Sequence, residues 1–265
     1  MDDEHYMRRA LEVARRARLR SRPNPWVGAV VVTSHNEVFE GATSEPGGPH
    51  AEVTALRLAG EKARGATLYC TLEPCSHIGR TGPCTEAIIA AGISRVVVGI
   101  EDPDDKVRGA GIARLSSAGL DVAVGTMADD VAHQLRAYVH HRTTGRPYVV
   151  VKMATTIDGR VSSSMPGERW LTGLPARTRV HKLRAESDAI LVGAGTVRAD
   201  DPELTTRLVE GPSPRRVVLG STPAGAKVRP CLEWSGALEE LLDRLGADGV
   251  LQLLVEAGPT VVTSF

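Results

Sequence analysis

The stretch that decides the fold of the N-terminal half reads A-T-L-Y-C-T-L-E-P-C-S-H-I-G-R-T-G-P-C over residues 66–84. Its first part, 66–72, is a short apolar run that predicts a buried strand. Residues 73–84 are rich in Gly, Pro and polar side chains, which is typical of a loop. Upstream, H-A-E at 50–52 opens a helical pattern of apolar residues that continues to Ala59. A histidine and two cysteines therefore stand at the ends of regular elements, where metal ligands are expected.

These residue types fit a catalytic zinc site, which needs three protein ligands and one open position for water. His50 would supply a nitrogen, and Cys75 and Cys84 would supply thiolates. Cys84 precedes a predicted helix, whose free backbone N–H groups favour a thiolate. Bound zinc lowers the pKa of water towards neutrality and so generates a nucleophile. Glu52, which follows His50 closely at the start of a helix, would take the proton of that water and pass it to a leaving amine.

The spacing of the cysteines departs from the general zinc-deaminase signature, in which H-x-E is followed by P-C-x-x-C. The first half of the signature is present at 50–52, but residues 76–83 separate the two cysteines. We expect this insertion to form a loop that places His77 and Arg80 beside the substrate.

A closed structural zinc site is the alternative, with His77 as its fourth ligand. Structural sites hold four protein ligands and have no need of an adjacent acid. Cys70 lies within an apolar strand pattern and is expected in the core, whereas Cys231 shows no partner pattern and is expected to be an ordinary thiol.

Residues 1–145 alternate between helical and strand patterns, which predicts an α/β sheet covered on both faces. The polar stretch 140–147 contains Gly and Pro and is expected to be a linker. The helices are expected near 3–19, 50–59, 85–91, 111–118 and 129–138, and the strands at 27–33, 66–72, 95–100 and 121–124.

Residues 146–265 are expected to form a second α/β unit. After the turn at 258–259 the chain ends on the apolar run V-V-T-S-F at 261–265, which reads as the start of another buried element. We therefore expect this unit to be incomplete. Its strands are expected at 148–153, 189–192, 216–219 and 250–255, and its helices at 175–185 and 236–245.

The composition excludes some classes of function. The 265 residues include 32 basic and 32 acidic side chains, and this balance argues against a protein that coats nucleic acid. The arginines of 8–22 alternate with apolar residues at helical spacing, which favours a solvated helix face over a binding arm. No apolar run has the length of a membrane span, and the acidic start at 1–4 is unlike a signal peptide. We expect a cytoplasmic protein, in which four cysteines indicate metal binding or catalysis.

Almost from end to end, the chain resembles the family of bifunctional riboflavin-biosynthesis deaminase/reductases. The first half carries the likeness in P-N-P-W-V-G at 23–28, H-A-E-V at 50–53, T-L-E-P-C-S-H at 71–77, G-R-T at 79–81 and P-C at 83–84. The second half carries it in Lys152, D-G-R at 158–160, Trp170, Arg184, A-D-D-P at 199–202 and E-A-G-P at 256–259. The long spacer between the cysteines is this family's own form.

The resemblance implies two consecutive reactions. An N-terminal cytidine-deaminase-like α/β/α sandwich with one zinc ion would hydrolyse the 2-amino group of a 2,5-diamino-6-ribosylamino-pyrimidinone 5′-phosphate and release ammonia. A C-terminal α/β domain, similar in fold to dihydrofolate reductase, would then reduce the ribosyl group to ribityl with NADPH. In the first site Asn24 would contact the pyrimidine, and His77 and Arg80 would face the ribose phosphate as charge-assisted donors.

For the second site the resemblance implies a cofactor set and a substrate set, and it implies a homo-oligomer. Glu168 and Ala257 depart from the family's common residues, and the chain ends soon after Pro259. We therefore expect deamination but poor reduction. The cofactor residues would be Ala154, Trp170, Thr196 and Asp200, and the substrate residues Lys152, Arg184, Leu204, Arg207 and Glu256.

Two other functions compete with this interpretation. A deaminase of nucleosides or tRNA bases would share the metal chemistry, but the zero net charge and the lack of an aromatic platform disfavour it. A deaminase-like scaffold without catalysis would have no need of the acid at Glu52.

Overall fold

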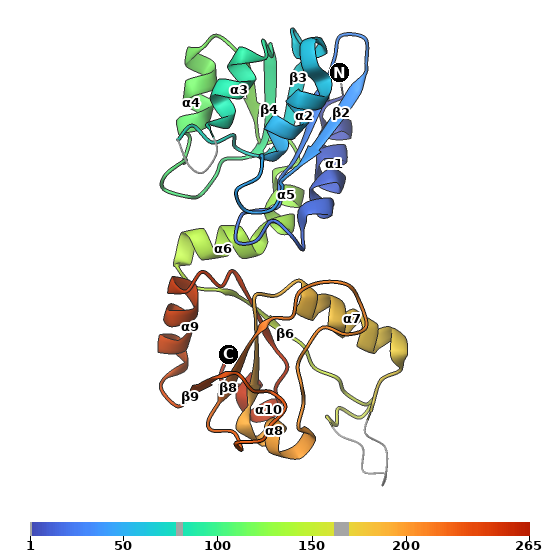
Figure 1. Ribbon diagram of the computed structural model, residues 1–265, viewed down its shortest axis with the longest axis vertical. Helices are drawn as coiled ribbons and strands as arrows, with labels where there is room; N and C mark the ends of the chain where they lie inside the picture. Colours follow the sequence, from blue (N-terminus) through green and yellow to red (C-terminus); the bar gives the residue numbers. More distant parts are fainter. Residues whose placement is uncertain (1, 78–81, 162–169) are drawn as a thin grey trace. The chain divides into compact units, whose positions relative to one another are not determined.

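The computed structural model describes residues 2–77, 82–161 and 170–265 (Figure 1). Arg80 and Glu168, both singled out from the sequence, lie outside these ranges. The chain divides into two compact units, Met1–Thr143 and Thr144–Phe265.

The first unit is built on a mixed five-stranded sheet in the order β2-β1-β3-β4-β5. β1 runs antiparallel to both β2 and β3, whereas β3, β4 and β5 are parallel. β1 and β3 are buried along their whole length, as their apolar sequences predict. The strands are β1 Gly28–Val32, β2 Val38–Ala42, β3 Thr67–Leu72, β4 Arg95–Ile100 and β5 Asp121–Val124.

Helices cover both faces of this sheet. Gly28 faces Ala10 of α1, while Gly41, which pairs with the next residue of β1, faces Ala51 of α2. Because neighbouring residues of a strand point to opposite faces, α1 and α2 lie on opposite sides. The helices are α1 Asp3–Ala14, α2 Ala51–Ala59, α3 Cys84–Ala90, α4 Ala110–Ser117, α5 Ala128–Gln134 and α6 Arg136–Thr144, with 3-10 turns at Arg15–Ala17 and Gly60–Ala63.

Three details of the first unit differ from the sequence-based prediction. The first helix ends at Ala14, whereas the sequence predicted a helix to residue 19. The strand β2 was not predicted, because Glu40 at its centre is polar and forms ion pairs with Arg9 and Arg16. The predicted linker 140–147 is wrong for residues 140–144, which belong to α6, whereas residues 145–147 connect α6 to the strand that begins at Tyr148. Tyr138 is buried and anchors this helix, which ends before a glycine with φ of 75°.

The second unit contains a five-stranded sheet in the order β6-β10-β7-β8-β9, in which every pair is parallel. The short helix α8 and the short strand β9 were not predicted. The strands are β6 Tyr148–Val151, β7 Ala189–Gly193, β8 Arg215–Leu219, β9 Leu232–Trp234 and β10 Gln252–Val255, and the helices are α7 Leu174–Ala185, α8 Ala194–Asp200, α9 Leu238–Ala247 and α10 Pro259–Val262.

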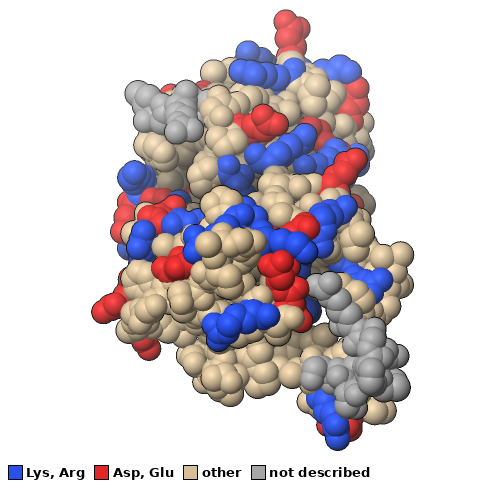
Figure 2. Space-filling view, turned by 60° about the horizontal axis from the view of Figure 1, so that its bottom comes forward, with Lys and Arg blue, Asp and Glu red and all other residues tan. Residues whose placement is uncertain are grey.

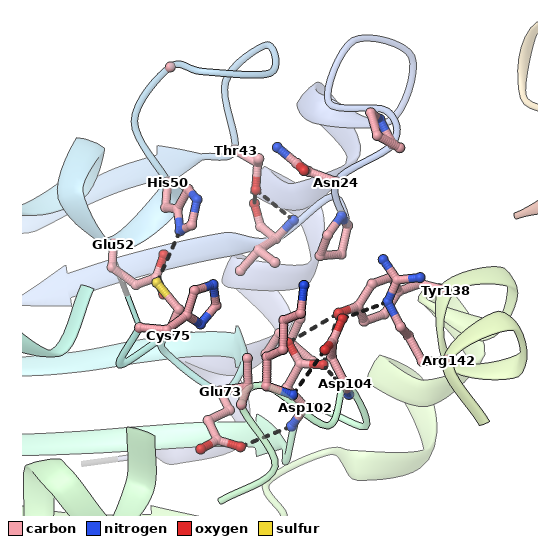
Figure 3. Close-up of a pocket in the computed structure, with 18 of the residues that line it drawn as sticks. Asn24, Thr43, His50, Glu52, Glu73, Cys75, Asp102, Asp104, Tyr138 and Arg142 are labelled. Carbon is pink, nitrogen blue, oxygen red and sulfur yellow. Dashed lines mark hydrogen bonds and ion pairs between the residues drawn. The ribbon is translucent and has the colours of Figure 1, made fainter. Parts of the chain in front are cut away.

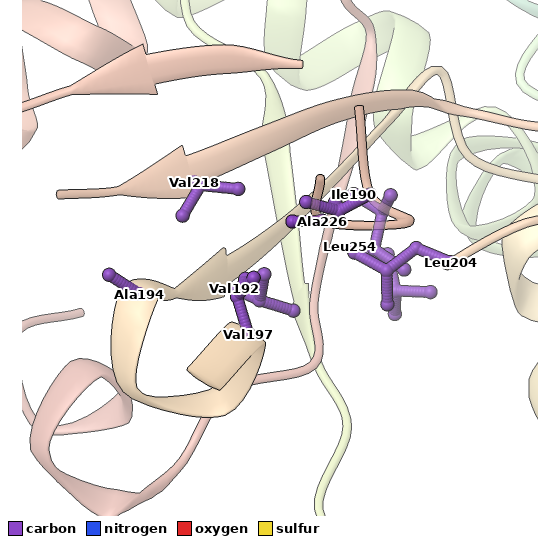
Figure 4. Packing of buried hydrophobic residues seen from close by; sticks show 9 residues of the cluster. Ile190, Val192, Ala194, Val197, Leu204, Val218, Ala226 and Leu254 are labelled. Carbon is purple, nitrogen blue, oxygen red and sulfur yellow. The ribbon is translucent and has the colours of Figure 1, made fainter. Parts of the chain in front are cut away.

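Two apolar clusters fill the two faces of this sheet. Ile190 and Val192 of β7 pack with Val197 of α8 on one face (Figure 4). The alternate residues Ala189 and Leu191 pack with the leucines of α9 on the other face. The apolar residues near the end of the chain belong to this second cluster, because Val261 and Val262 of α10 pack against it.

The helices that the structure describes include none that is long and apolar enough to cross a membrane.

The contact between β2 and α2 yields a test of the fold, because α2 carries Glu52. A Cβ added at Gly41 would lie 2.0 Å from the Ala51 oxygen and 2.5 Å from the Ala55 nitrogen, which are backbone atoms that cannot rotate away. We expect Gly41→Ala to lower the free energy of unfolding by about 3 kcal/mol. The control is Gly82→Ala, where the added Cβ meets nothing within 4 Å. Equal stability of the two variants in urea denaturation would contradict this packing.

Candidate active sites

His50, Cys75 and Cys84 come together at one end of the first sheet. His50 is the N-cap of α2, Cys75 follows β3, and Cys84 begins α3. His50 Nδ1 lies 3.2 Å from Cys84 Sγ and 3.5 Å from Cys75 Sγ. The three ligand atoms all lie within 4.8 Å of one another, and among the described residues no other such metal-ligand group occurs. His77, the alternative fourth ligand, is not part of the group.

The chemistry of this donor set fits zinc, which prefers imidazole and thiolate ligands. Hydrogen bonds with Cys84 and with His50 together lower the pKa of Cys75 to about 4, although burial opposes the shift. The pKa of Cys84 is raised, first by its hydrogen bond with Cys75 and then by burial. The backbone N–H of Cys84 also points at Cys75 Sγ, 3.5 Å away. Without a metal, the negative charge therefore concentrates on Cys75, where it attracts a cation.

Glu52 lies in the first turn of α2, beside these ligands, and is only 3% exposed. Burial raises the pKa of its carboxyl to about 7, although the neighbouring His50 opposes the shift. A carboxyl with a pKa near neutrality can both accept and donate a proton at cellular pH.

A cavity of about 460 Å³ is lined by Glu52 and by two of the candidate metal ligands, His50 and Cys75 (Figure 3). The loop at 23–25 contributes Asn24 to its wall, and His77 lines it from the loop between the cysteines. The structure thus brings Asn24, His77 and two of the candidate metal ligands, His50 and Cys75, to one cavity.

Glu73 is a wall residue of this cavity that the sequence analysis treated only as part of a loop. It is 4% exposed, and its carboxylate accepts four backbone N–H groups. Oε2 accepts from Asp102 (3.0 Å) and Gly109 (3.0 Å), and Oε1 accepts from Gly111 (2.8 Å) and Ile112 (3.1 Å). The carboxylate therefore fixes the segment after β4 and the start of α4 to the strand that leads to Cys75.

A second group of missed residues joins α6 to the cavity wall. The hydroxyl of Tyr138 donates to the Asp102 carboxylate at 2.9 and 3.2 Å, and Arg142 Nε lies 2.8 Å from Asp104 Oδ2. Burial raises the pKa of Asp102. The available signal was D-P-D at 102–104, because side chains that follow a parallel strand line the edge where ligands bind.

In the second unit, Glu256 joins two of the predicted substrate residues. Arg184 donates to both of its carboxylate oxygens, at 2.7 and 3.0 Å, and Lys152 Nζ lies 3.6 Å away. A cavity of about 750 Å³ lies beside them and is lined by predicted residues of both sets: Lys152, Ala154, Thr196, Asp200 and Glu256.

Four predicted residues do not line this cavity: Arg184, Trp170, Leu204 and Arg207. Trp170 is 58% exposed, with the guanidinium of Arg177 5.1 Å from its ring centre. Leu204 is 3% exposed and packs in the apolar cluster of α8, so its side chain belongs to the core. Arg207 forms an exposed ion pair with Glu203.

Comparison with protein families supports both units. The family model of the cytidine and deoxycytidylate deaminase zinc-binding region matches residues 1–100, and the family model of the RibD C-terminal domain matches residues 147–265. The riboflavin biosynthesis protein RibD of Aquifex aeolicus is 39% identical over 99% of this chain and 83% of its own length. The chain belongs to the RibD family of riboflavin biosynthesis proteins.

Other RibD proteins agree with this assignment. The Escherichia coli protein is 49% identical, and the alignment covers 79% of this chain and 57% of that protein. The structure of Acinetobacter baumannii RibD superposes with a TM-score of 0.92 at 37% identity, over 99% of this chain and 82% of that chain. A Thermotoga maritima structure superposes with a TM-score of 0.88 at 35% identity, over 99% of this chain and 83% of that chain. It is described as a diaminohydroxyphosphoribosylaminopyrimidine deaminase/5-amino-6-(5-phosphoribosylamino)uracil reductase.

The family assignment makes the first unit a zinc-binding deaminase domain and the second unit a RibD reductase domain that uses NADPH. The expectation of an incomplete second unit finds no support in the family model, which matches this unit from residue 147 to residue 265. The alignments with the Aquifex and Acinetobacter RibD proteins cover 99% of this chain, and 83% and 82% of those proteins. Impaired reduction therefore no longer follows from the sequence.

The Glu73 carboxylate gives the prediction for this site. Glu73→Gln replaces one carboxylate oxygen by an NH2 group, which cannot accept a hydrogen bond, so two buried backbone N–H groups lose their partner. We expect the free energy of unfolding of the first unit to fall by about 2–4 kcal/mol. The matched control is Glu86→Gln, which removes an exposed ion pair with Arg114 and is expected to lower that free energy by less than about 1 kcal/mol. Similar urea midpoints for both variants would show that Glu73 is not a structural anchor.

Proposed function

We propose that the first unit deaminates 2,5-diamino-6-ribosylamino-pyrimidinone 5′-phosphate and that the second unit then reduces its ribosyl group to ribityl with NADPH. The observation that carries the deaminase proposal is the position of Glu52, which is buried beside the group of His50, Cys75 and Cys84 and lines a cavity with two of them. Membership of the RibD family supports the substrate and the order of the two reactions.

In the proposed mechanism, the chain's own residues bind the substrate and move one proton. Zinc, held by His50 and the two cysteines, supplies the Lewis acidity that makes water a nucleophile at neutral pH. Glu52 accepts a proton from the attacking water and donates it to the nitrogen that leaves as ammonia. The burial of Glu52, which raises its pKa to about 7, suits both transfers.

The proposed substrate contacts in the deaminase site come from two loops. Asn24 would read the polar edge of the pyrimidine, while His77 and Arg80 would bind the phosphate. The positions of Asn24 and His77 on the cavity wall support their part of this assignment. The role of Arg80 rests on the family resemblance alone.

For the reductase we propose that Lys152, Arg184 and Glu256 bind the substrate with Leu204 and Arg207, and that Ala154, Trp170, Thr196 and Asp200 contact the cofactor. NADPH supplies the hydride in this reaction. Glu256 holds Arg184 through two hydrogen bonds, and a paired guanidinium fixed in this way presents its remaining donors in one orientation. The contribution of Leu204 would come from its backbone, because its side chain is buried.

We further propose a cytoplasmic homo-oligomer that does not act on nucleic acid. The balance of 32 basic and 32 acidic residues supports the last point, and acidic side chains stand among the basic ones on the face shown in Figure 2. None of the four cysteines forms a disulfide, as is usual in a reducing compartment. A scaffold without catalysis is disfavoured, because it would have no reason to bury a carboxyl at the metal ligands.

Glu52→Gln tests the deaminase mechanism. The amide keeps the size of the side chain but can no longer carry the proton, so ammonia release is expected to fall by roughly 10²–10⁴-fold with the zinc content unchanged. Glu61→Gln, a surface change on the turn after α2, serves as the control and should release ammonia normally. Normal deamination by the Glu52→Gln variant at full zinc occupancy would assign the proton transfer to another group.

Glu256→Gln tests the reductase. The unaltered chain is expected to oxidise NADPH with the deaminated intermediate and not with the diamino substrate. The variant leaves Arg184 without its charged partner, and its NADPH oxidation is expected to fall at least roughly tenfold while ammonia release stays unchanged. Equal NADPH oxidation by both proteins would remove Glu256 from the proposed site.

A further inference from the structure

The segment that follows α8, residues 203–207, adopts an unusual backbone conformation. Leu204 has a φ of 56°, in the left-handed region that branched side chains rarely adopt, and it is 3% exposed. Such a conformation persists only where the surrounding structure holds it in place.

Two side chains on one face of α7 hold this segment. Arg184 Nη1 donates to the Thr205 carbonyl oxygen at 3.1 Å, and His181 Nδ1 accepts the Arg207 backbone N–H at 2.9 Å. Residues three apart in a helix lie next to each other on its surface, so the two contacts act on neighbouring parts of the segment. Arg184 also pairs with Glu256, which links the segment to the end of β10.

The hydrogen bond to Arg207 fixes the protonation of His181. Because a backbone N–H can only donate, Nδ1 must be unprotonated, and the ring proton of the neutral side chain lies on Nε2. His181 is 6% exposed. Burial lowers its pKa, and the charges of Arg184 and Arg207 lower it further, while Glu256 opposes them. The side chain therefore stays neutral, as the contact requires.

We propose that His181 is a positioning residue of the reductase site, whose Nδ1 holds the backbone of Arg207 and with it the segment 203–207, to which Arg184 is also bound. The inference rests on the proposed reductase function of the second unit. The alternative is that His181 is a core residue with a satisfied hydrogen bond and no influence on substrate binding.

Two amide substitutions separate these roles. His181→Asn keeps an acceptor oxygen at the place of Nδ1, whereas His181→Gln carries its amide further out, towards the place of Nε2. Both variants are polar and close in size, so a purely structural role predicts similar behaviour for the two. A positioning role predicts that only the Gln variant loses the contact with Arg207.

The measurement is steady-state NADPH oxidation with the deaminated intermediate, with ammonia release by the first unit of the same protein as the internal control. For His181→Gln, the KM for the intermediate is expected to rise roughly tenfold, with the kcat and the KM for NADPH nearly unchanged. For His181→Asn, the KM for the intermediate should return close to that of the unaltered chain. An equal KM for the two variants, or an equal fall in kcat in both, would overturn the proposal.

The nitrogen NMR spectrum of the unaltered chain provides a test that does not depend on the folding of a variant. A neutral His181 ring protonated on Nε2 at pH 7 is expected, and a ring protonated on Nδ1 would overturn the proposal. A failure of the unaltered chain to oxidise NADPH would overturn the proposed reductase function instead, and that result is distinguishable from a change confined to the His181 variants.

Discussion

The first unit depends on one buried carboxylate, that of Glu73. It accepts four backbone N–H groups from the segment after β4 and the first turn of α4, all between 2.8 and 3.1 Å. A buried carboxylate is stable only where such donors surround it, and a helix N-terminus provides them. At Gly111 the approach is so close that a Cβ would lie 1.9 Å from the Pro74 oxygen. Cys75 follows directly in the chain, so the same contact fixes the strand end that carries a proposed metal ligand.

A related constraint organises the second unit. Glu256 follows β10, Lys152 follows β6, and the two strands are parallel neighbours, so both side chains emerge at the same edge of the sheet. Arg184 reaches this edge from α7 and binds the same carboxylate. In each unit a buried acid at the carboxyl end of parallel strands thus joins elements that are distant in the sequence, at the edge where α/β folds bind ligands. Glu73 accepts hydrogen bonds from backbone N–H groups, and Glu256 accepts them from the guanidinium of Arg184. These bonds leave the side chains at each site little freedom to move.

The sequence predicted what depends on local patterns and on the chemistry of single residues. The proposed metal site could be recognised from the sequence, because H-A-E at 50–52 and the two cysteines stand at the ends of predicted helices and strands. Histidine and cysteine are the residue types that zinc prefers. The roles of Glu73 and Asp102 could not be, because their partners lie tens of residues away and only the folded chain brings them together. The strand β2 was missed because Glu40 at its centre forms ion pairs. Residues 140–144 of α6 were taken for part of a linker because Tyr138, before them, is the buried residue of this helix. Leu204 was placed at the substrate by family resemblance, but its side chain lies in the core.

The central claim is that three protein ligands hold zinc beside Glu52 and leave one position open. The zinc K-edge X-ray absorption spectrum of the purified chain, loaded with one zinc ion, tests this claim most directly. We predict two sulfur neighbours at about 2.3 Å, the multiple-scattering pattern of a single imidazole at about 2.0–2.1 Å, and one further light atom that does not come from the protein. A second imidazole or a third sulfur in the coordination shell would reveal a closed structural site and would contradict the account.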